Sequence, residues 1–182
     1  MWRALLLSVL AITMGCASQA PIEDVRPELE YQEIDIGRGR AVLLDVIAVV
    51  NADLTEQGLL DEDFSLALEL KRDMRAALFN FGFTTAHQPE LADLQLQVSV
   101  DELTFVMGED PVFTPVFMRN GISFKLQKQA VTHTFSYATQ RTEKMGLSPS
   151  LQTQRALVSE ILSDTLQRAL RDQAFIAELS AE

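Results

Sequence analysis

The sequence has few of the residues that cross-link a protein or equip it for catalysis. Cys16 is the only cysteine among 182 residues, so no disulfide within the chain can hold the fold and a packed core must stabilise it. The two histidines, His87 and His133, lie far apart in the sequence. No His-Glu-x-x-His motif, Gly-x-Ser-x-Gly motif or glycine-rich phosphate loop occurs. These absences favour a protein that is not an enzyme and that binds no cofactor and no metal.

Basic residues and long apolar runs are also scarce. The chain has 15 Lys and Arg against 26 Asp and Glu, which gives a net charge of −11. A negative surface without clustered basic residues repels nucleic acid, so we expect no nucleic-acid partner. After the N-terminal leader, no segment approaches 18 uninterrupted apolar residues, so we expect no transmembrane helix. The acidic runs 61–63 and 109–110 are expected to be helix-start and turn residues; weak calcium binding is the alternative.

Cys16 follows an apolar leader at the N-terminus. The leader has a basic start at Arg3, an apolar stretch over residues 4–14 and small residues on both sides of the cysteine. This pattern is typical of a secretory signal peptide over residues 1–15, because the apolar stretch is too short to cross a bilayer. The run Ile12-Thr13-Met14-Gly15-Cys16 resembles the lipobox of bacterial lipoproteins, which implies that the Cys16 thiol is acylated and anchors the mature chain. The alternative is an ordinary cleaved leader with a chance cysteine.

Residues 16–40 are expected to form a lipidated tether that leads to a single α+β domain over residues 41–182. Prolines and acidic residues interrupt any apolar period in the tether. The alternative is that residues 31–36 pair as an edge strand. Ala17 follows the cysteine, where the sorting rule of enteric bacteria wants Asp for retention in the inner membrane. We therefore expect the protein at the outer membrane, with its domain facing the periplasm.

The first half of the domain predicts a buried strand and an amphipathic helix. Residues 41–50 are β-branched and mostly apolar on both faces, which is typical of an interior strand, and a polar loop is expected over residues 51–58. A helix is expected to begin near Asp61 or Asp63, either of which can cap it. It is expected to end at Gly82, because the residue after a helix often adopts the left-handed backbone conformation that glycine favours. Its apolar residues share one side, so the helix lies on one surface.

The second half predicts an antiparallel meander. Apolar residues alternate over residues 94–100 and then change phase, so we expect a bulge near Asp101 and Glu102. Two more strands are expected over residues 122–127 and 131–137, joined by a hairpin.

A closing helix completes the expected fold. It opens at Ser148 and Pro149, and its apolar surface is so wide that something besides the sheet must cover it, either a terminal turn over residues 175–179 or a partner. The element order is β-α-β-β-β-α. A mainly antiparallel sheet with two helices on one face predicts an α+β fold, a two-layer sandwich.

Four features together suggest a family. They are the lipidated leader, Phe81-Gly82-Phe83 after the first helix, the alternating strand over residues 92–100, and Ile161-Leu162-Ser163-Asp164-Thr165-Leu166 followed by Ile176. In these features the chain resembles the YajG-type bacterial outer-membrane lipoproteins. The resemblance implies an outer-membrane location and an α+β fold, and it implies no biochemical activity.

Two non-enzymatic functions fit these expectations. One is an adaptor or accessory binding protein for another envelope component, with a membrane contact through the lipid, an envelope protein as partner and homo-oligomers left open. The other is a carrier or assembly factor for an amphipathic ligand such as lipopolysaccharide. A site for phosphorylated lipid needs clustered Lys and Arg, so the charge favours the adaptor. An activator of a peptidoglycan synthase is a third candidate by analogy of fold alone.

Residues 103–118 are the candidate partner contact. The segment is apolar, carries few charges and contains two prolines that interrupt a strand ladder. Aromatic residues and methionine are enriched in the cores of interfaces. We therefore expect a partner to touch the four side chains Phe105, Met107, Phe113 and Phe117. The alternative is that the segment packs on its own domain.

Overall fold

The computed structural model describes residues 24–30, 34–48, 52–61, 65–110, 112–146 and 148–181. The expected signal peptide and the acylation site Cys16 lie outside these residues, so both stay predictions.

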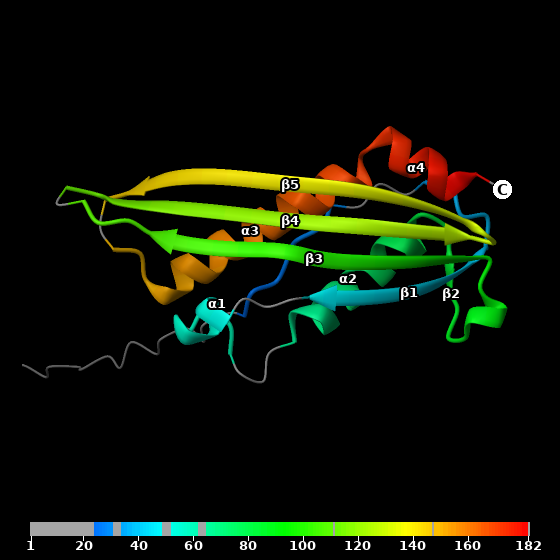
Figure 1. Cartoon of the computed structure of the whole chain (residues 1–182), viewed down its shortest axis with the longest axis horizontal. Coiled ribbons are helices and arrows are strands. Elements are labelled where there is room, and N and C mark those ends of the chain that lie inside the picture. The colour runs from blue at the N-terminus through cyan, green and yellow to red at the C-terminus, as the bar shows by residue number, and fades with distance from the viewer. Residues whose placement is uncertain are drawn as a thin grey trace, which may run out of the picture.

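One layer of the fold is a five-stranded sheet in the order β2-β1-β3-β4-β5 (Figure 1). The strands are β1 (Ala41–Ala48), β2 (Thr84–Thr85), β3 (Leu94–Met107), β4 (Thr114–Lys128) and β5 (Val131–Met145). β1 runs parallel to β2 and to β3, whereas β3, β4 and β5 form an antiparallel meander. A helical crossover joins β1 to β3, as a parallel pair requires.

The helices form the second layer on one face of the sheet (Figure 1). α2 (Leu66–Asn80) packs on β1, and α3 (Leu151–Leu170) packs on β4 and β5. The shorter elements are α1 (Ala52–Glu56), the 3₁₀ turn η1 (Pro89–Leu91) and α4 (Gln173–Ser180). The predicted two-layer α+β sandwich is confirmed, and the structure adds α1, β2, η1 and α4 to the predicted order.

The predicted bulge in β3 is confirmed. The pairing of β3 with β4 shifts register between Val100 and Glu102. Before the shift the even-numbered side chains face the core, and after it Leu103 and Phe105 do so. One extra residue in β3 thus keeps both halves of the strand apolar on the helix side.

α2 begins later than the sequence suggested. The N-cap is Ser65, whose hydroxyl accepts a hydrogen bond from the Leu68 amide (3.3 Å), and not Asp61 or an acid at position 63. The other end fits the prediction, because Gly82 follows the helix with a φ of 80°. The loop expected over residues 51–58 contains the short helix α1.

β4 and β5 are longer than the expected strands. β4 starts at Thr114, so Pro115 is its second residue, where a proline costs little of the ladder. β5 continues to Met145 through polar residues without an apolar period. Arg141 on this extension binds Glu160 (2.6 Å) and Asp164 (2.9 Å) of α3, so ion pairs support it in place of apolar contacts.

Residues 24–30 do not form part of a free tether, in contrast to the expectation for residues 16–40. We call them the N-terminal strap. Val25 and Pro27 are buried, and the strap amides of Arg26 and Glu28 donate hydrogen bonds to Ser159 Oγ (3.0 Å) and Ser163 Oγ (2.8 Å) of α3. Two buried apolar side chains and these hydrogen bonds hold the strap on the helix. Residues 34–36 are not a strand, unlike the alternative considered for residues 31–36.

The wide apolar surface of α3 is covered from several sides. The expected terminal turn is helix α4, whose Phe175 and Leu179 are fully buried. The Phe175 ring packs against Phe124 of β4 (5.0 Å between centroids) and Phe135 of β5 (5.3 Å). The strap covers another side of α3. Within the described part of the chain, no helix has the length and apolar character needed to cross a membrane.

Candidate interaction site

The connection between β3 and β4 contains hydrogen-bonded turn residues at one end of the sheet. The Gly108 amide donates a hydrogen bond to the Pro115 carbonyl (2.7 Å) and closes the strand ladder. Asp110 Oδ1 accepts hydrogen bonds from the amides of Val112 (2.9 Å) and Phe113 (3.3 Å). An aspartate that bonds the backbone two residues ahead fixes a turn, so Asp110 is a turn acid, as expected for run 109–110.

Apolar side chains are concentrated at this turn. The exposed fractions are 56% for Val106, 39% for Met107, 77% for Val112 and 47% for Phe117. Phe113 is half-buried, and the Lys144 ammonium lies 4.9 Å from the centre of its ring. We call the five side chains Val106, Met107, Val112, Phe113 and Phe117 the hairpin end.

The structure places three of the four expected contact residues at the hairpin end and the fourth in the core. Phe105 is only 2% exposed and faces the helices. The apolar phase that begins at Leu103 after the bulge turns Phe105 inward, so it does not contact a partner in this fold. The hairpin end instead includes Val106 and Val112, which the choice of aromatic residues and methionine left out.

Exposed apolar residues elsewhere are more scattered. Leu68 and Phe79 are 67% and 76% exposed on α2, but eleven residues separate them. At 1.5 Å per residue they lie about 16 Å apart along the helix. Single exposed apolar side chains are normal on soluble proteins, whereas the hairpin end concentrates five at one turn. Val106 and Phe117 face each other on the uncovered side of the sheet, and Met107 lies on the helix side.

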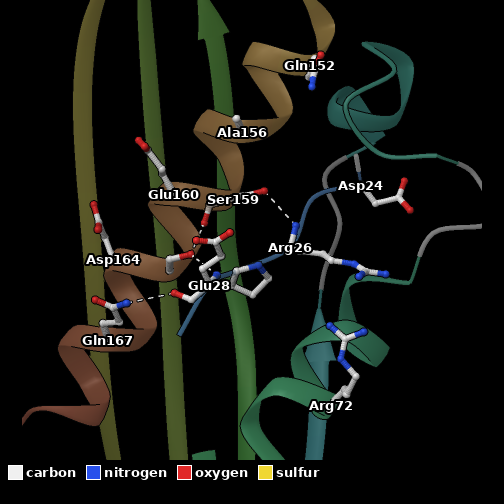
Figure 2. A pocket seen from close by; sticks show the side chains of 12 residues that line it. Asp24, Arg26, Glu28, Arg72, Gln152, Ala156, Ser159, Glu160, Asp164 and Gln167 are labelled. Carbon is white, nitrogen blue, oxygen red and sulfur yellow. Dashed lines mark hydrogen bonds between the residues drawn. The ribbon is translucent and has the colours of Figure 1, made fainter. Parts of the chain in front are cut away.

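A polar groove lies between the strap, α2 and α3 (Figure 2). Its volume is about 870 Å³, and Asp24, Arg26, Glu28, Arg72, Glu160, Asp164 and Gln167 are among its lining residues. Figure 2 shows Arg26 and Arg72 on the α2 side of the groove, with Glu160 and Asp164 on α3. Glu69 pairs with both arginines, at 3.6 Å from Arg26 and 2.6 Å from Arg72. The arginines of the groove therefore already have an acidic partner.

The serine hydroxyls of this groove are also engaged. Ser159 Oγ and Ser163 Oγ donate to the carbonyls of Arg155 (2.9 Å) and Ser159 (2.7 Å), one helical turn earlier. Both hydroxyls accept from the strap amides, and Gln167 Nε2 donates to the Glu28 carbonyl (3.1 Å). Neither serine is placed as a nucleophile, because no histidine or other base contacts it in the described residues.

A buried arginine fixes the start of the strap. Arg155 of α3 is 6% exposed and donates to the Gly58 carbonyl (2.9 Å) and to Asp61 Oδ1 (2.6 Å). Its Nη1 lies 3.5 Å from Asp24 Oδ1. The hydrogen bond from Arg155 lowers the pKa of the Asp61 carboxyl below its usual value. Asp61 therefore serves a structural ion pair and not the helix start.

The structure brings no metal-binding cluster together in the described residues. His133 is half-buried, and its Nε2 lies 3.4 Å from Glu178 Oε1 of α4, which fits a packing histidine with a polar partner. His87 lies exposed in the loop before η1.

The Tyr137 hydroxyl, which lies under α4, has a strongly shifted pKa. The Tyr137 hydroxyl donates to Asp172 Oδ2 (2.8 Å), and Asp172 caps α4 by accepting from the Ala174 amide (2.8 Å). Burial, with Asp172 beside it, raises the pKa of Tyr137 well above its usual value. The Tyr137 hydrogen bond lowers the pKa of Asp172. The pair holds α4 against β5.

The comparisons with known proteins add likenesses of fold. No family model matches the chain, and no curated protein matches it. Among solved structures, the neuraminyllactose-binding hemagglutinin homolog of Helicobacter pylori is similar at 11% identity, over 89% of this chain and 97% of that one, with a TM-score of 0.48. A DUF330 protein from Xanthomonas campestris has 8% identity over 80% and 93% of the two chains, with a TM-score of 0.46.

A third similar structure is lipoprotein GNA1162 from Neisseria meningitidis, at 14% identity over 73% of this chain and 99% of that one, with a TM-score of 0.29. TM-scores below 0.5 at these identities show neither a family nor an activity. The resemblance to YajG-type lipoproteins therefore stays a prediction.

Proposed function

We propose that this chain is a lipid-anchored accessory protein of the bacterial envelope that binds another envelope component and has no enzymatic activity. The leader pattern supports an acyl anchor on Cys16, and Ala17 supports transfer to the outer membrane with the domain in the periplasm. The α+β sandwich is the domain that this anchor holds.

The observation that carries this proposal is the hairpin end. Five apolar side chains lie at a turn supported by hydrogen bonds to the Asp110 carboxylate and by the Gly108–Pro115 hydrogen bond. Hydrogen bonds that order a turn before binding lower the entropy lost on binding, which favours the turn as a contact site. Met107, Phe113 and Phe117 are the proposed contact residues, together with Val106 and Val112.

Crosslinking in intact cells tests the contact. A photoreactive residue in place of Val112 should give an adduct with an envelope component, and Phe117→Asp in the same chain should abolish it. The matched control is a photoreactive residue at Lys125, which is exposed on β4 eight residues beyond Phe117. An adduct of equal yield at position 125, or none at position 112, would contradict the proposal.

Metabolic labelling with a fatty acid tests the anchor. The wild-type chain should take up label and fractionate with membranes, and Cys16→Ala should do neither. A labelled, membrane-bound Cys16→Ala chain would refute the anchor and leave the test of the contact unaffected.

A further inference from the structure

The strap begins in the half of the molecule that contains the hairpin end. Asp24, the first described residue, lies 3.5 Å from Arg155, the fifth residue of α3. α3 begins six residues after β5 ends at Met145, and Met145 pairs with Thr114 at the start of β4. Asp24 therefore lies in the half of the long axis that holds the β3–β4 turn, as do α1 and the start of α3 (Figure 1).

The strap limits how far the domain can stand from its anchor. Because residues 24–30 are bound to α3, eight residues separate Cys16 from the first bound residue, Asp24, and they span at most about 29 Å. The fifteen residues of β5 make the sheet about 50 Å long. Arg141 lies ten residues, about 33 Å, from the start of β5 at the β4–β5 turn, and it binds Glu160 of α3. Asp24 lies beside Arg155, which is five residues further along α3 from that turn, so a domain standing upright on the β4–β5 turn would hold Asp24 further from the membrane than eight residues reach. The anchor therefore excludes that orientation and favours those that bring the hairpin end toward the bilayer.

The chemistry of the hairpin end fits a lipid surface. Val112 is the most exposed of its side chains and sits at the outermost turn, with Val106 and Phe117 paired behind it. Lys144 lies over the Phe113 ring. An aromatic ring with a lysine beside an apolar tip is the arrangement found where proteins meet the boundary of acyl chains and head groups.

We propose that the hairpin end docks on the phospholipid surface of the membrane that holds the Cys16 anchor. This names the envelope component of the proposed contact and rests on the proposed anchor. The net charge of −11 and the acids Glu109 and Asp110 in the turn favour zwitterionic head groups over anionic ones. Docking orients the sheet and leaves its uncovered face and the outer edge of β5 accessible.

Single-tryptophan fluorescence tests the docking. Cleavage before Cys16 removes the only tryptophan, Trp2, so the mature wild-type chain contributes no tryptophan fluorescence. Val112→Trp places a probe at the tip, and Val131→Trp is the matched control, because Val131 is a 56% exposed valine at the opposite end of the sheet. The acylated full-length mature protein carrying each change is reconstituted into vesicles of phosphatidylcholine and phosphatidylethanolamine with brominated acyl chains. Circular dichroism confirms that each variant is folded.

Docking predicts that bromine quenches Val112→Trp severalfold more than Val131→Trp, with a blue-shifted emission for the tip probe alone. Equal quenching of both probes overturns the inference, even when flotation shows the vesicles carrying the protein. A blue shift at position 112 without quenching means that a second copy covers the tip, and it also overturns the inference. If the acylated protein does not float with vesicles, the anchor fails and the inference fails with it, so flotation separates the two failures.

Discussion

Asn120 tests what a buried polar side chain without hydrogen-bonding partners costs the fold. It lies in the middle of β4 with none of its surface exposed, on the helix side of the sheet between the buried Met118 and Ile122. Neither its Nδ2 nor its Oδ1 has a hydrogen-bonding partner in the described part of the chain. Thr165 of α3 is equally buried, but its hydroxyl bonds Thr139 Oγ1 (2.8 Å) and the Ile161 carbonyl (2.8 Å).

These two residues should respond in opposite ways to an apolar substitution. A buried polar group without a partner costs about 1–3 kcal/mol, so Asn120→Leu, which keeps the branched shape, should raise the free energy of unfolding by about that amount. For a domain of this size, the melting temperature would rise by roughly 3–10 °C. Thr165→Val removes satisfied hydrogen bonds and should lower the free energy of unfolding by about 0.5–1.5 kcal/mol.

Urea unfolding followed by far-ultraviolet circular dichroism measures both changes. Asn120→Val serves as a smaller substitute, because a leucine that fits poorly would hide the gain from removing the amide. The reasoning is refuted if both Asn120→Leu and Asn120→Val lower the free energy of unfolding as much as Thr165→Val does. In that case the amide is satisfied in solution.

Three further predictions follow from the fold. Leu96→Ala should cost about 2–5 kcal/mol in urea unfolding, because Leu96 lies between the sheet and the helices; Gln97→Ala on the uncovered face should stay within about 0.5 kcal/mol, and equal losses would mean that both faces are covered. Tyr137→Phe should lower the melting temperature at pH 7, because it removes the hydrogen bond that lowers the pKa of Asp172. This bond stabilises the fold only while the Asp172 carboxyl is ionised, so the difference in melting temperature from the wild type should narrow as the pH falls below about 4. A difference that widens there would contradict the pairing. Arg155→Met keeps the apolar stem but loses the bonds to the loop after α1, so a glutamyl endopeptidase should cut after Glu28 of the strap faster than in the wild type; unchanged cleavage would show that Arg155 does not hold the strap.

The features that the sequence predicted are those with a strong local period. The alternation in β3 and its change of phase located the bulge between Val100 and Glu102, because a side-chain period of two leaves no other way to keep both halves buried. The helix over residues 66–80 and the left-handed Gly82 were visible for the same reason. Their signals lie within a few residues of one another.

The features that it missed depend on distant contacts. The strap has only Val25, Pro27 and Leu29 as apolar residues, too few to show a period, and its hydrogen-bonding partners on α3 come more than 130 residues later. The extension of β5 shows no apolar alternation, because Arg141 meets acids of α3 there. The helix cap was missed for a similar reason. The sequence offered Asp61 as the cap, but Arg155, a distant residue, binds the Asp61 carboxylate, and Ser65 caps the helix.

The candidate contact was predicted from composition alone, and its binding to a partner stays a prediction. Composition did locate exposed apolar side chains in residues 103–118, because aromatic and methionine residues beside prolines indicate a surface turn. It could not separate Phe105 from Phe117, because that choice depends on which way the strand faces after the bulge. The sequence did hold a signal that Phe105 is buried. Leu103 and Phe105 are two residues apart in one strand, so their side chains face the same side of the sheet.

The uncovered face of the sheet changes character at the hairpin end. Along most of this face the cross-strand pairs are polar, such as Gln95 with Gln127 and Ser99 with Ser123, which suits a surface that meets water. Val106 and Phe117 break this pattern by standing directly opposite each other. A cross-strand apolar pair supports its strands by about 0.2–1 kcal/mol, which accounts for part of the extension of β3 and β4. Yet about half of each side chain stays exposed, and Val112 beyond them pairs with no strand, so support of the strands alone does not explain the patch. A surface that covers the turn from outside, such as the bilayer in the proposed docking, accounts for all of these side chains at once.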